Sequence, residues 1–363
     1  MKHWLETRQV LDRLAELSTA GRRAALATVI NVKGSAYRHE GAKMLVAEDG
    51  SSVGNVSGGC LEQDVREVAL RVIRSGTSEL RSYCSGSDEV EAWDLGLGCD
   101  GQVDVFVEPV SAARSDERGL LDGRRAFAAC SVIKGPDALA ERRMVVTAAA
   151  VNGSLEAGLD GRVVGRARER LHTGEPGVDQ VAGYTVFIDV LQPPPQLALF
   201  GAGDDAIPLA RFAAAAGFRV IVVDYRHGYL TRERFPHAAA LVATDASGGL
   251  GEVGLDDDSF AVVMTHNYAH DQAYVAALLK TPAPYVGMLG PRARRKRIVQ
   301  SLEITGAVPR DHAERLFGPV GLDIGTDGAE QVALSVIAEV LAIRSGRAAR
   351  SLRDRSAPIH AET

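Results

Sequence analysis

The sequence predicts an α/β protein in two parts: an N-terminal α/β domain with a glycine-rich cysteine turn, and a C-terminal Rossmann-like domain with a doubly wound parallel sheet. Three observations lead to this prediction. After residue 195, short apolar segments alternate with helical patterns, which is typical of βαβ units. Residues 201–206 read Gly-Ala-Gly-Asp-Asp-Ala, with the glycine spacing of a dinucleotide-binding turn. Residues 193–195 are all proline and predict a stiff linker between the parts.

The N-terminal domain is expected to comprise residues 1–110. Apolar residues at helical spacing between residues 10 and 17 predict an amphipathic helix that ends near Gly21. Asp49-Gly50 has the sequence of a hairpin turn. The strands expected here are apolar or alternating and comprise residues 24–30, 43–47 and 102–108.

Residues 111–192 are expected to form a connecting α/β segment. Residues 144–151 and 184–190 predict strands, and the pairs 152–153 and 160–161 predict turns. This order loosely repeats that of residues 24–60, but without a second cysteine turn. The sequence leaves open whether the segment is a degenerate repeat that packs with the N-terminal domain.

The Rossmann-like domain is expected to comprise residues 193–345, followed by a loose basic tail at 346–363. Helical patterns separate its short apolar strands, and a last helix is expected at residues 329–343. The strands expected here comprise residues 196–200, 219–224, 260–264 and 284–289.

Composition excludes several classes of function. A formal net charge of −6 gives no electrostatic basis for nucleic acid binding. No segment approaches the roughly 20 apolar residues that span a bilayer, and the charged N-terminus excludes a secretory signal. The cysteines at 60, 84, 99 and 130 form no C-x-x-C pair, so neither a zinc ribbon nor a thioredoxin motif is indicated, and we assign no metal-binding residues. We expect a cytoplasmic protein.

The segment Ser57-Gly58-Gly59-Cys60 is the most informative feature of the chain. An apolar-periodic run follows it, so Cys60 is expected at or near a helix N-terminus, where free N–H groups and the helix dipole favour a thiolate. Such a thiolate can attack, carry sulfur or ligate a soft metal, and the turn can bind an oxyanion through its backbone.

Other side chains of the N-terminal half are weaker candidates. Arg38 and Lys43 flank a polar loop and are candidates to pair with an anion near Cys60; the alternative is surface salt bridging. Cys99 lies among glycines and is the second-choice reactive thiol. The cysteines at 84 and 130 are expected to be inert packing residues.

The glycine turn makes Gly201 and Gly203 candidates to contact a dinucleotide. Asp224 ends the next strand, where an acid can hold a ribose hydroxyl. Asp204 and Asp205, however, place two negative charges where a pyrophosphate would bind. A Rossmann scaffold without a dinucleotide, or with another phosphorylated ligand, is therefore an equal alternative.

Two further groups follow later strands of this domain. His266 comes directly after an expected strand, at the edge where α/β sheets bind ligands, and is a candidate for proton transfer; an exposed residue beside a helix cap is the alternative. Arg292, Arg294 and Arg295 follow a glycine-rich segment and are candidates to bind phosphate; the alternative is a solvated basic helix face.

Taken together, these motifs resemble one family, the xanthine dehydrogenase accessory proteins of the XdhC/CoxI type. Asp204 departs from the family pattern, which usually has histidine there, and Tyr37 stands where proline is common. The resemblance spans most of residues 20–345 and rests on residues 34–44, 53–62, 194–203, 285–290 with the arginines that follow, and 318–325.

The resemblance implies a role in enzyme maturation. Such proteins are thought to bind molybdenum cofactor (molybdopterin), support its sulfuration and deliver it to a molybdenum hydroxylase of the xanthine dehydrogenase class. The expected partners are that client enzyme, a cysteine desulfurase and a second copy of the chain in a homodimer. The cofactor is expected between the two domains, with Cys60 as the key thiol and the Gly58-Gly59 backbone, Arg38 and the basic cluster around its anionic groups.

Two functions from other classes remain open on sequence grounds. An NAD(P)-dependent oxidoreductase would use His266 as its acid or base. An interaction scaffold would keep the Rossmann unit without any small-molecule ligand.

Overall fold

The computed structural model describes residues 2–34, 36–84, 101–110, 114–135, 142–245, 250–307 and 309–355. The chain divides into two compact units, Lys2–Pro193 and Pro194–Arg355, so that the boundary lies within the proline run. The first unit contains both the expected N-terminal domain and the connecting segment. Among the described residues, no helix combines the length and apolarity that crossing a membrane requires.

The first unit begins with a five-stranded antiparallel sheet in the order β3-β2-β1-β5-β4. Helix α2 covers one face of it, with Val65, Val68 and Val72 packed on Ala27 and Val107. The elements are α1 (Lys2–Thr19), β1 (Ala24–Gly34), β2 (Lys43–Ala47), β3 (Ser52–Gly54), α2 (Glu62–Ser75), β4 (Glu79–Cys84) and β5 (Gly101–Val110).

A second five-stranded sheet in the same unit has the order β8-β7-β6-β10-β9. Helix α1 packs Trp4 and Leu11 in one apolar cluster with Leu26 of the first sheet and Phe127 and Val145 of the second. The elements are α4 (Ser115–Asp122), β6 (Phe127–Lys134), β7 (Arg143–Val146), β8 (Val151–Gly153), α5 (Asp160–Thr173), β9 (Gly177–Val181) and β10 (Tyr184–Leu191).

The two sheets have the same topology. In each, three strands precede a helix and two strands follow it. The registers also agree: Thr28 pairs with Lys43 in the first sheet, as Ser131 pairs with Arg143 in the second. This agreement supports the hypothesis of an internal duplication, which the sequence only suggested.

Three local predictions for the connecting segment were wrong. Residues 144–151 form two strands, β7 and β8, because the backbone of Thr147 donates to Ala150 and turns the chain. Residues 152–153 therefore lie in β8 rather than in a turn. Residues 160–161 begin α5, where Asp160 accepts hydrogen bonds from the loop before it.

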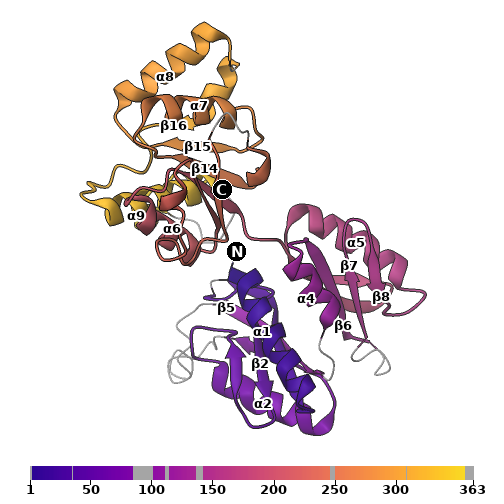
Figure 1. Cartoon of the computed structure of the whole chain (residues 1–363). Coiled ribbons are helices and arrows are strands. Elements are labelled where there is room, and N and C mark those ends of the chain that lie inside the picture. The colour runs from indigo at the N-terminus through magenta and orange to yellow at the C-terminus, as the bar shows by residue number, and fades with distance from the viewer. Residues whose placement is uncertain are drawn as a thin grey trace. The chain divides into compact units, whose positions relative to one another are not determined.

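The second unit is a doubly wound Rossmann-like domain, as predicted. Its six strands are all parallel and follow the order β13-β12-β11-β14-β15-β16. Side chains of α6 and α9 share one apolar cluster with alternate residues of β11, and those of α7 and α8 share another, so the helices cover both faces (Figure 1). The strands are β11 (Gln196–Phe200), β12 (Arg219–Asp224), β13 (Ala240–Ala243), β14 (Ser259–Val263), β15 (Tyr285–Met288) and β16 (Leu316–Phe317).

Within the described part of the chain, α-helices and short 3-10 helices complete this unit. The α-helices are α6 (Ala206–Ala215), α7 (Tyr268–Leu278), α8 (Arg292–Thr305) and α9 (Ala329–Arg344), and the 3-10 helices are η2 (His227–Tyr229), η3 (Gly251–Val253), η4 (Arg310–Arg315) and η5 (Leu352–Asp354). The carboxyl ends of the parallel strands therefore lie next to the N-termini of α6, α7 and α8, which is the edge where such sheets bind ligands.

Candidate functional site

The turn that contains Cys60 directly precedes α2. Its thiol is exposed, and the helix begins two residues later at Glu62, so the predicted position near a helix N-terminus is confirmed. Gly58 and Gly59 are exposed beside it, whereas Val56 and Leu61 are buried and anchor the two ends of the turn in the apolar core. The turn therefore presents a sulfur atom on a short, well-anchored segment.

Glu62 fixes the conformation of this turn. Its carboxylate accepts hydrogen bonds from the amides of Val56 and Ser57, at 3.2 and 2.8 Å, and from the Ser57 hydroxyl at 2.5 Å. The Ser57 oxygen in turn accepts from the amides of Gly59 and Leu61, both at 3.1 Å. Burial alone would raise the pKa of Glu62, but these donors outweigh it and hold the pKa below 4.5.

This network limits which backbone groups can reach a ligand. The amides of Val56, Ser57, Gly59 and Leu61 already have acceptors within the turn. Among the described residues, no acceptor is recorded for the N–H groups on either side of Gly59, those of residues 58 and 60. The sequence identified Ser57 as a candidate but did not show that the Glu62 carboxylate fixes the turn by hydrogen bonds. An acid in the first helical turn, five residues after a serine, is a pattern that could have predicted this role.

The neighbouring polar loop supplies an aromatic ring to the turn. A Cβ atom built on Gly58 would lie 3.5 Å from ring carbons of Tyr37, whose side chain is 69% exposed. Arg38 is buried and forms a two-pronged ion pair with Glu6. Its guanidinium is thus engaged by the protein, and the predicted contact with a ligand anion stays a prediction.

Lys43 belongs to a different, buried pair. Its ammonium lies 2.6 Å from the Asp189 carboxylate, and both side chains are almost inaccessible. His3 lies in the same cluster, where burial first and the charge of Lys43 second lower its pKa to about 4. The imidazole is therefore neutral at pH 7. Lys43 therefore forms a salt bridge, which was the alternative to an anion contact, but inside the unit rather than at its surface.

The remaining cysteines differ in exposure. Cys130 is fully buried, and burial raises the pKa of its thiol to about 12, as expected of an inert packing residue. Cys84 is exposed at the end of β4, so its assignment as a packing residue was wrong. The glycine-rich segment around Cys99 lies outside the described residues.

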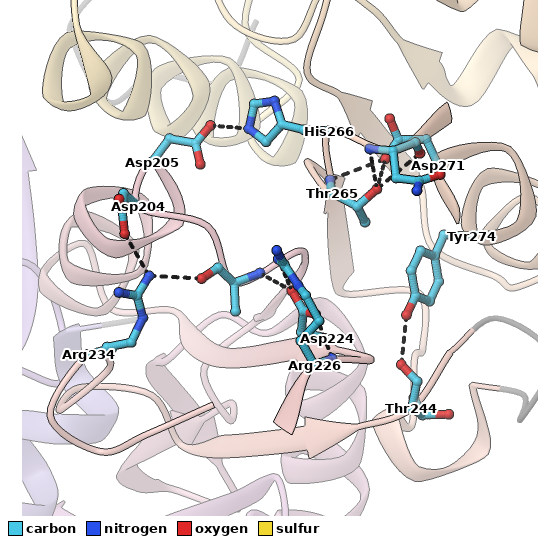
Figure 2. Close-up of polar contacts among 12 residues, drawn as sticks. Asp204, Asp205, Asp224, Arg226, Arg234, Thr244, Thr265, His266, Asp271 and Tyr274 are labelled. Carbon is cyan, nitrogen blue, oxygen red and sulfur yellow. Dashed lines mark hydrogen bonds and ion pairs between the residues drawn. The ribbon is translucent and has the colours of Figure 1, made fainter. Parts of the chain in front are cut away.

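In the second unit, the glycine turn connects β11 with α6 (Figure 2). Gly201 has a φ of +124°, and a Cβ there would lie 2.5 Å from the carbonyl oxygen of Met264, so the close approach to β14 requires glycine. Asp224 ends β12 as predicted, but protein groups occupy its carboxylate. Arg226 donates to it through Nε and Nη2, at 2.9 and 2.8 Å, and the amide of Ala202 donates at 2.7 Å.

The two acids of the glycine turn have cationic or polar partners. Asp204 pairs with Arg234 at 2.8 Å, and Asp205 lies 2.8 Å from Nε2 of His266 (Figure 2). A Cβ on Gly203 would itself lie 2.9 Å from Asp205. The repulsion that the sequence suggested is thus compensated within the protein. Contacts of this kind join distant segments, so no local motif identified Arg234 in advance.

His266 occupies the predicted edge of the sheet, just after β14. Its backbone is left-handed, with a φ of +59°, which is uncommon outside glycine and is often associated with functional positions. The expected helix cap is supplied by the next residue, Asn267, whose side chain accepts from two amides at the start of α7. His270 stacks on Tyr225, with ring centroids 4.2 Å apart, which accounts for its position without a catalytic role.

The predicted arginines of α8 separate into two environments. Arg294 is partly buried and pairs at 2.8 Å with the buried Asp271, which also accepts from Thr265 (Figure 2 shows Asp271 and Thr265). Arg292 and Arg295 instead line an open pocket together with the loop at Gly318 and Pro319.

Comparisons with known proteins agree on one family. A model described as the XdhC and CoxI family matches residues 17–84, and a model of the XdhC Rossmann domain matches residues 197–340. The chain is 36% identical to a Bacillus subtilis protein named as a probable xanthine dehydrogenase subunit, over 327 residues that cover 88% of this chain and 93% of that protein. The chain belongs to the XdhC and CoxI family.

Two further proteins are similar to this one over nearly the whole chain. The molybdenum cofactor insertion chaperone PaoD of Escherichia coli is 25% identical over 338 residues, covering 93% of this chain and 88% of that protein. A crystal structure described as a xanthine dehydrogenase from Bacillus halodurans matches with a TM-score of 0.75 and 29% identity, covering 94% of this chain and 98% of the other. The resemblance read from the motifs is confirmed, and so is the α/β architecture with its XdhC-type Rossmann domain.

Proposed function

We propose that this XdhC and CoxI family member is a maturation factor that binds molybdenum cofactor, supports its sulfuration and assists its insertion into a xanthine dehydrogenase-type hydroxylase. Two relatives, one named as an insertion chaperone and one as part of a xanthine dehydrogenase, support the maturation role. The observation that carries the proposal is the Cys60 turn, where Glu62 and Ser57 hold an exposed thiol in place.

The donor set of this turn fits the cofactor. A thiolate is a soft ligand suited to molybdenum. The N–H groups of Gly58 and Cys60, for which no acceptor is recorded among the described residues, can donate to anionic oxygen. The exposed ring of Tyr37 beside Gly58 can stack on a flat heterocycle. When bound, the cofactor supplies the metal and dithiolene chemistry, while the chain binds, orients and shields it.

The experiment replaces the thiol and measures cofactor directly. Cys60→Ala protein, purified from a molybdenum-replete host, is expected to retain about tenfold less molybdopterin than wild type, since one metal–sulfur contact is worth at least a tenfold change in affinity. Transfer to a cofactor-free hydroxylase should fall in parallel. Cys84→Ala is the matched control, because Cys84 is also exposed but lies on β4.

Equal binding and transfer by the Cys60→Ala and wild-type proteins would show that the thiol has no part in the process. The same transfer assay, run with and without a cysteine desulfurase, tests that partner. Sedimentation of the purified chain tests the homodimer. Both partners stay predictions.

A dinucleotide-dependent oxidoreductase is the second candidate, because His266 and Asp205 form a pair suited to proton transfer beside the glycine turn. The engagement of Asp224 by Arg226 disfavours it, since a ribose hydroxyl would have to displace an internal ion pair. Titration with NADH, followed by fluorescence, distinguishes the two: we expect no saturable binding below millimolar concentrations.

A further inference from the structure

An open pocket of about 620 Å³ lies between α8 and the loop after β16, and its lining includes no residue of the Cys60 turn or of the glycine turn. Arg292, Arg295 and Lys296 line it, opposite the loop at Gly318 and Pro319. Within the described part of the chain, no carboxylate belongs to its lining. The three cations have the spacings i, i+3 and i+4, which place them on one face of the helix.

This arrangement is unfavourable for the helix alone. The first turn of α8 contains no acidic residue and carries arginines instead, although the positive end of a helix dipole favours acids there. Like charges at i, i+3 and i+4 also repel one another. Among the described residues, no ion pair is recorded for Arg292 or Lys296. A bound anion would relieve this repulsion.

The loop on the opposite side of the pocket packs closely against Arg295. A Cβ on Gly318 would lie 3.0 Å from the Arg295 side chain, so glycine lets the loop approach the aliphatic part of that residue. Arg295 also donates through Nε to the carbonyl of Leu316 at 3.0 Å. Its guanidinium is therefore held at the wall of the pocket before any ligand arrives, which reduces the entropy lost on binding.

The pocket is separate from the dinucleotide turn of the same sheet. It lies beyond the carboxyl ends of β15 and β16, whereas the glycine turn follows β11, with β14 between them in the strand order. The anion-binding position at β11 is occupied by internal ion pairs of Asp224 and Asp204. For the pocket cations of α8, no such pair is recorded with any residue that the structure describes.

We propose that the α8 pocket binds the phosphate group of a phosphorylated small molecule. Arg292, Arg295 and Lys296 supply charge-assisted hydrogen bonds to its oxygens. The concave shape and the backbone loop on its far side favour a compact anion over an acidic protein surface. The proposal keeps the expectation that Arg292 and Arg295 bind phosphate and adds Lys296 and the loop at Gly318 and Pro319 to the site. It does not rest on the cofactor role of the Cys60 turn, because it holds for any phosphomonoester or diphosphate.

Titration calorimetry of the full chain with inorganic pyrophosphate tests this assignment. The double variant Arg292→Glu with Lys296→Glu is expected to weaken binding by about tenfold or more, because two charge-assisted contacts become repulsive. Arg297→Glu is the matched control, since Arg297 is exposed on the same helix but does not line the pocket. Arg292→Glu places an acid in the first turn, where the helix dipole favours it, and Lys296 is exposed, so the double variant should retain its fold by circular dichroism.

Further arms of the experiment identify the source of the phosphate. Binding of AMP with the same loss in the double variant indicates a phosphomonoester of a larger ligand, whereas binding of pyrophosphate alone indicates a free diphosphate. Absence of binding to wild type at millimolar ligand would overturn the proposal. So would an equal loss in Arg297→Glu, or tighter binding of a polyglutamate peptide than of pyrophosphate. None of these outcomes depends on Cys60, so this test and the cofactor test fail independently.

Discussion

At the scale of single residues, Glu62 decides the shape of the Cys60 turn. Two amides and one hydroxyl donate to its carboxylate, which is half-buried at the start of α2. Hydrogen bonds to a charged acceptor are stronger than neutral ones and depend on its ionisation. The geometry around the thiol therefore depends on a side chain two residues beyond Cys60.

Replacement of Glu62 by glutamine should loosen this turn. We expect Glu62→Gln to lower the free energy of unfolding by about 1 kcal/mol or more, because the charge-assisted bonds to Val56 and Ser57 become neutral or are lost. Urea unfolding measures this difference. Glu67→Gln, an exposed position on the same helix, should change stability by less than about 0.5 kcal/mol.

The effect should depend on pH in a defined direction. The pKa of Glu62 is lowered in the folded state from the ordinary value of 4.5. Its contribution is therefore fully present above pH 4.5 and is lost as the pH falls through the folded-state pKa. The stability difference between wild type and Glu62→Gln should shrink below that pH. A difference that stayed constant, or grew, on acidification would refute this account.

At the scale of elements, the glycines that end β3 and β8 show why two distant hairpins have one shape. Gly54 and Gly153 both have positive φ, +84° and +78°. A Cβ at either position would lie 2.2 or 2.3 Å from the carbonyl oxygen of the basic residue that begins the partner strand, Lys43 or Arg143. Both hairpins therefore require glycine for the same two reasons, strain and collision.

Alanine at these two glycines should be severely destabilising. We expect Gly54→Ala and Gly153→Ala each to lower the free energy of unfolding by about 3 kcal/mol or more, because the backbone contact cannot relax. Gly50→Ala isolates the strain, since its φ is +82° but nothing lies within 4 Å of the added Cβ. It should lose only about 1 kcal/mol in the same unfolding experiment. Equal losses at positions 50 and 54 would contradict the collision argument.

Local pattern predicted the elements that have regular periodicity. In the Rossmann unit, β11, β12, β14 and β15 follow from apolar runs, as do β1 and β2 in the first unit, and the glycine turn follows from its spacing. The short strands β13 and β16 were not predicted. The β7–β8 hairpin was missed because residues 148–151 are also apolar, so the turn at Thr147 leaves no polar signal. The pairing of Asp204 with Arg234 was missed as well, because it joins segments 30 residues apart that a local motif does not relate. The pairing of Asp224 with Arg226 is local, but the Rossmann pattern assigned that acid to a ribose hydroxyl instead.

At the scale of the whole molecule, reciprocal buried ion pairs join the two sheets of the first unit. Lys43 of the first sheet pairs with Asp189 of the second at 2.6 Å. Arg143, at the position in the second sheet that corresponds to Lys43, lies 3.6 Å from Glu108 of the first. Arg143 also pairs with the buried Glu117 at 2.6 Å; although burial would raise the pKa of Glu117, Arg143 and Arg114 hold it below its usual range.

The arrangement predicts how the first unit responds to loss of a single charge. Lys43→Met should lower its free energy of unfolding by about 3–5 kcal/mol, because the charge of Asp189 is left buried without a partner. Lys43→Met combined with Asp189→Leu should be less destabilising than either single change, since no unpaired charge remains. A double-mutant cycle in urea measures this coupling.

Because the two units meet at Pro193 and Pro194, the double-mutant cycle should report on the stability of the first unit alone. A fragment of residues 2–193 contains both members of the ion pair and both sheets, so it should fold alone and show the same coupling as the full chain. A fragment of residues 194–355 should also show a melting transition of its own. In the full chain, the transition of this second unit should occur at the same temperature with and without Lys43→Met. If the 2–193 fragment remained unfolded, or if Lys43→Met shifted every transition of the full chain equally, the two compact units would not be independent folding domains.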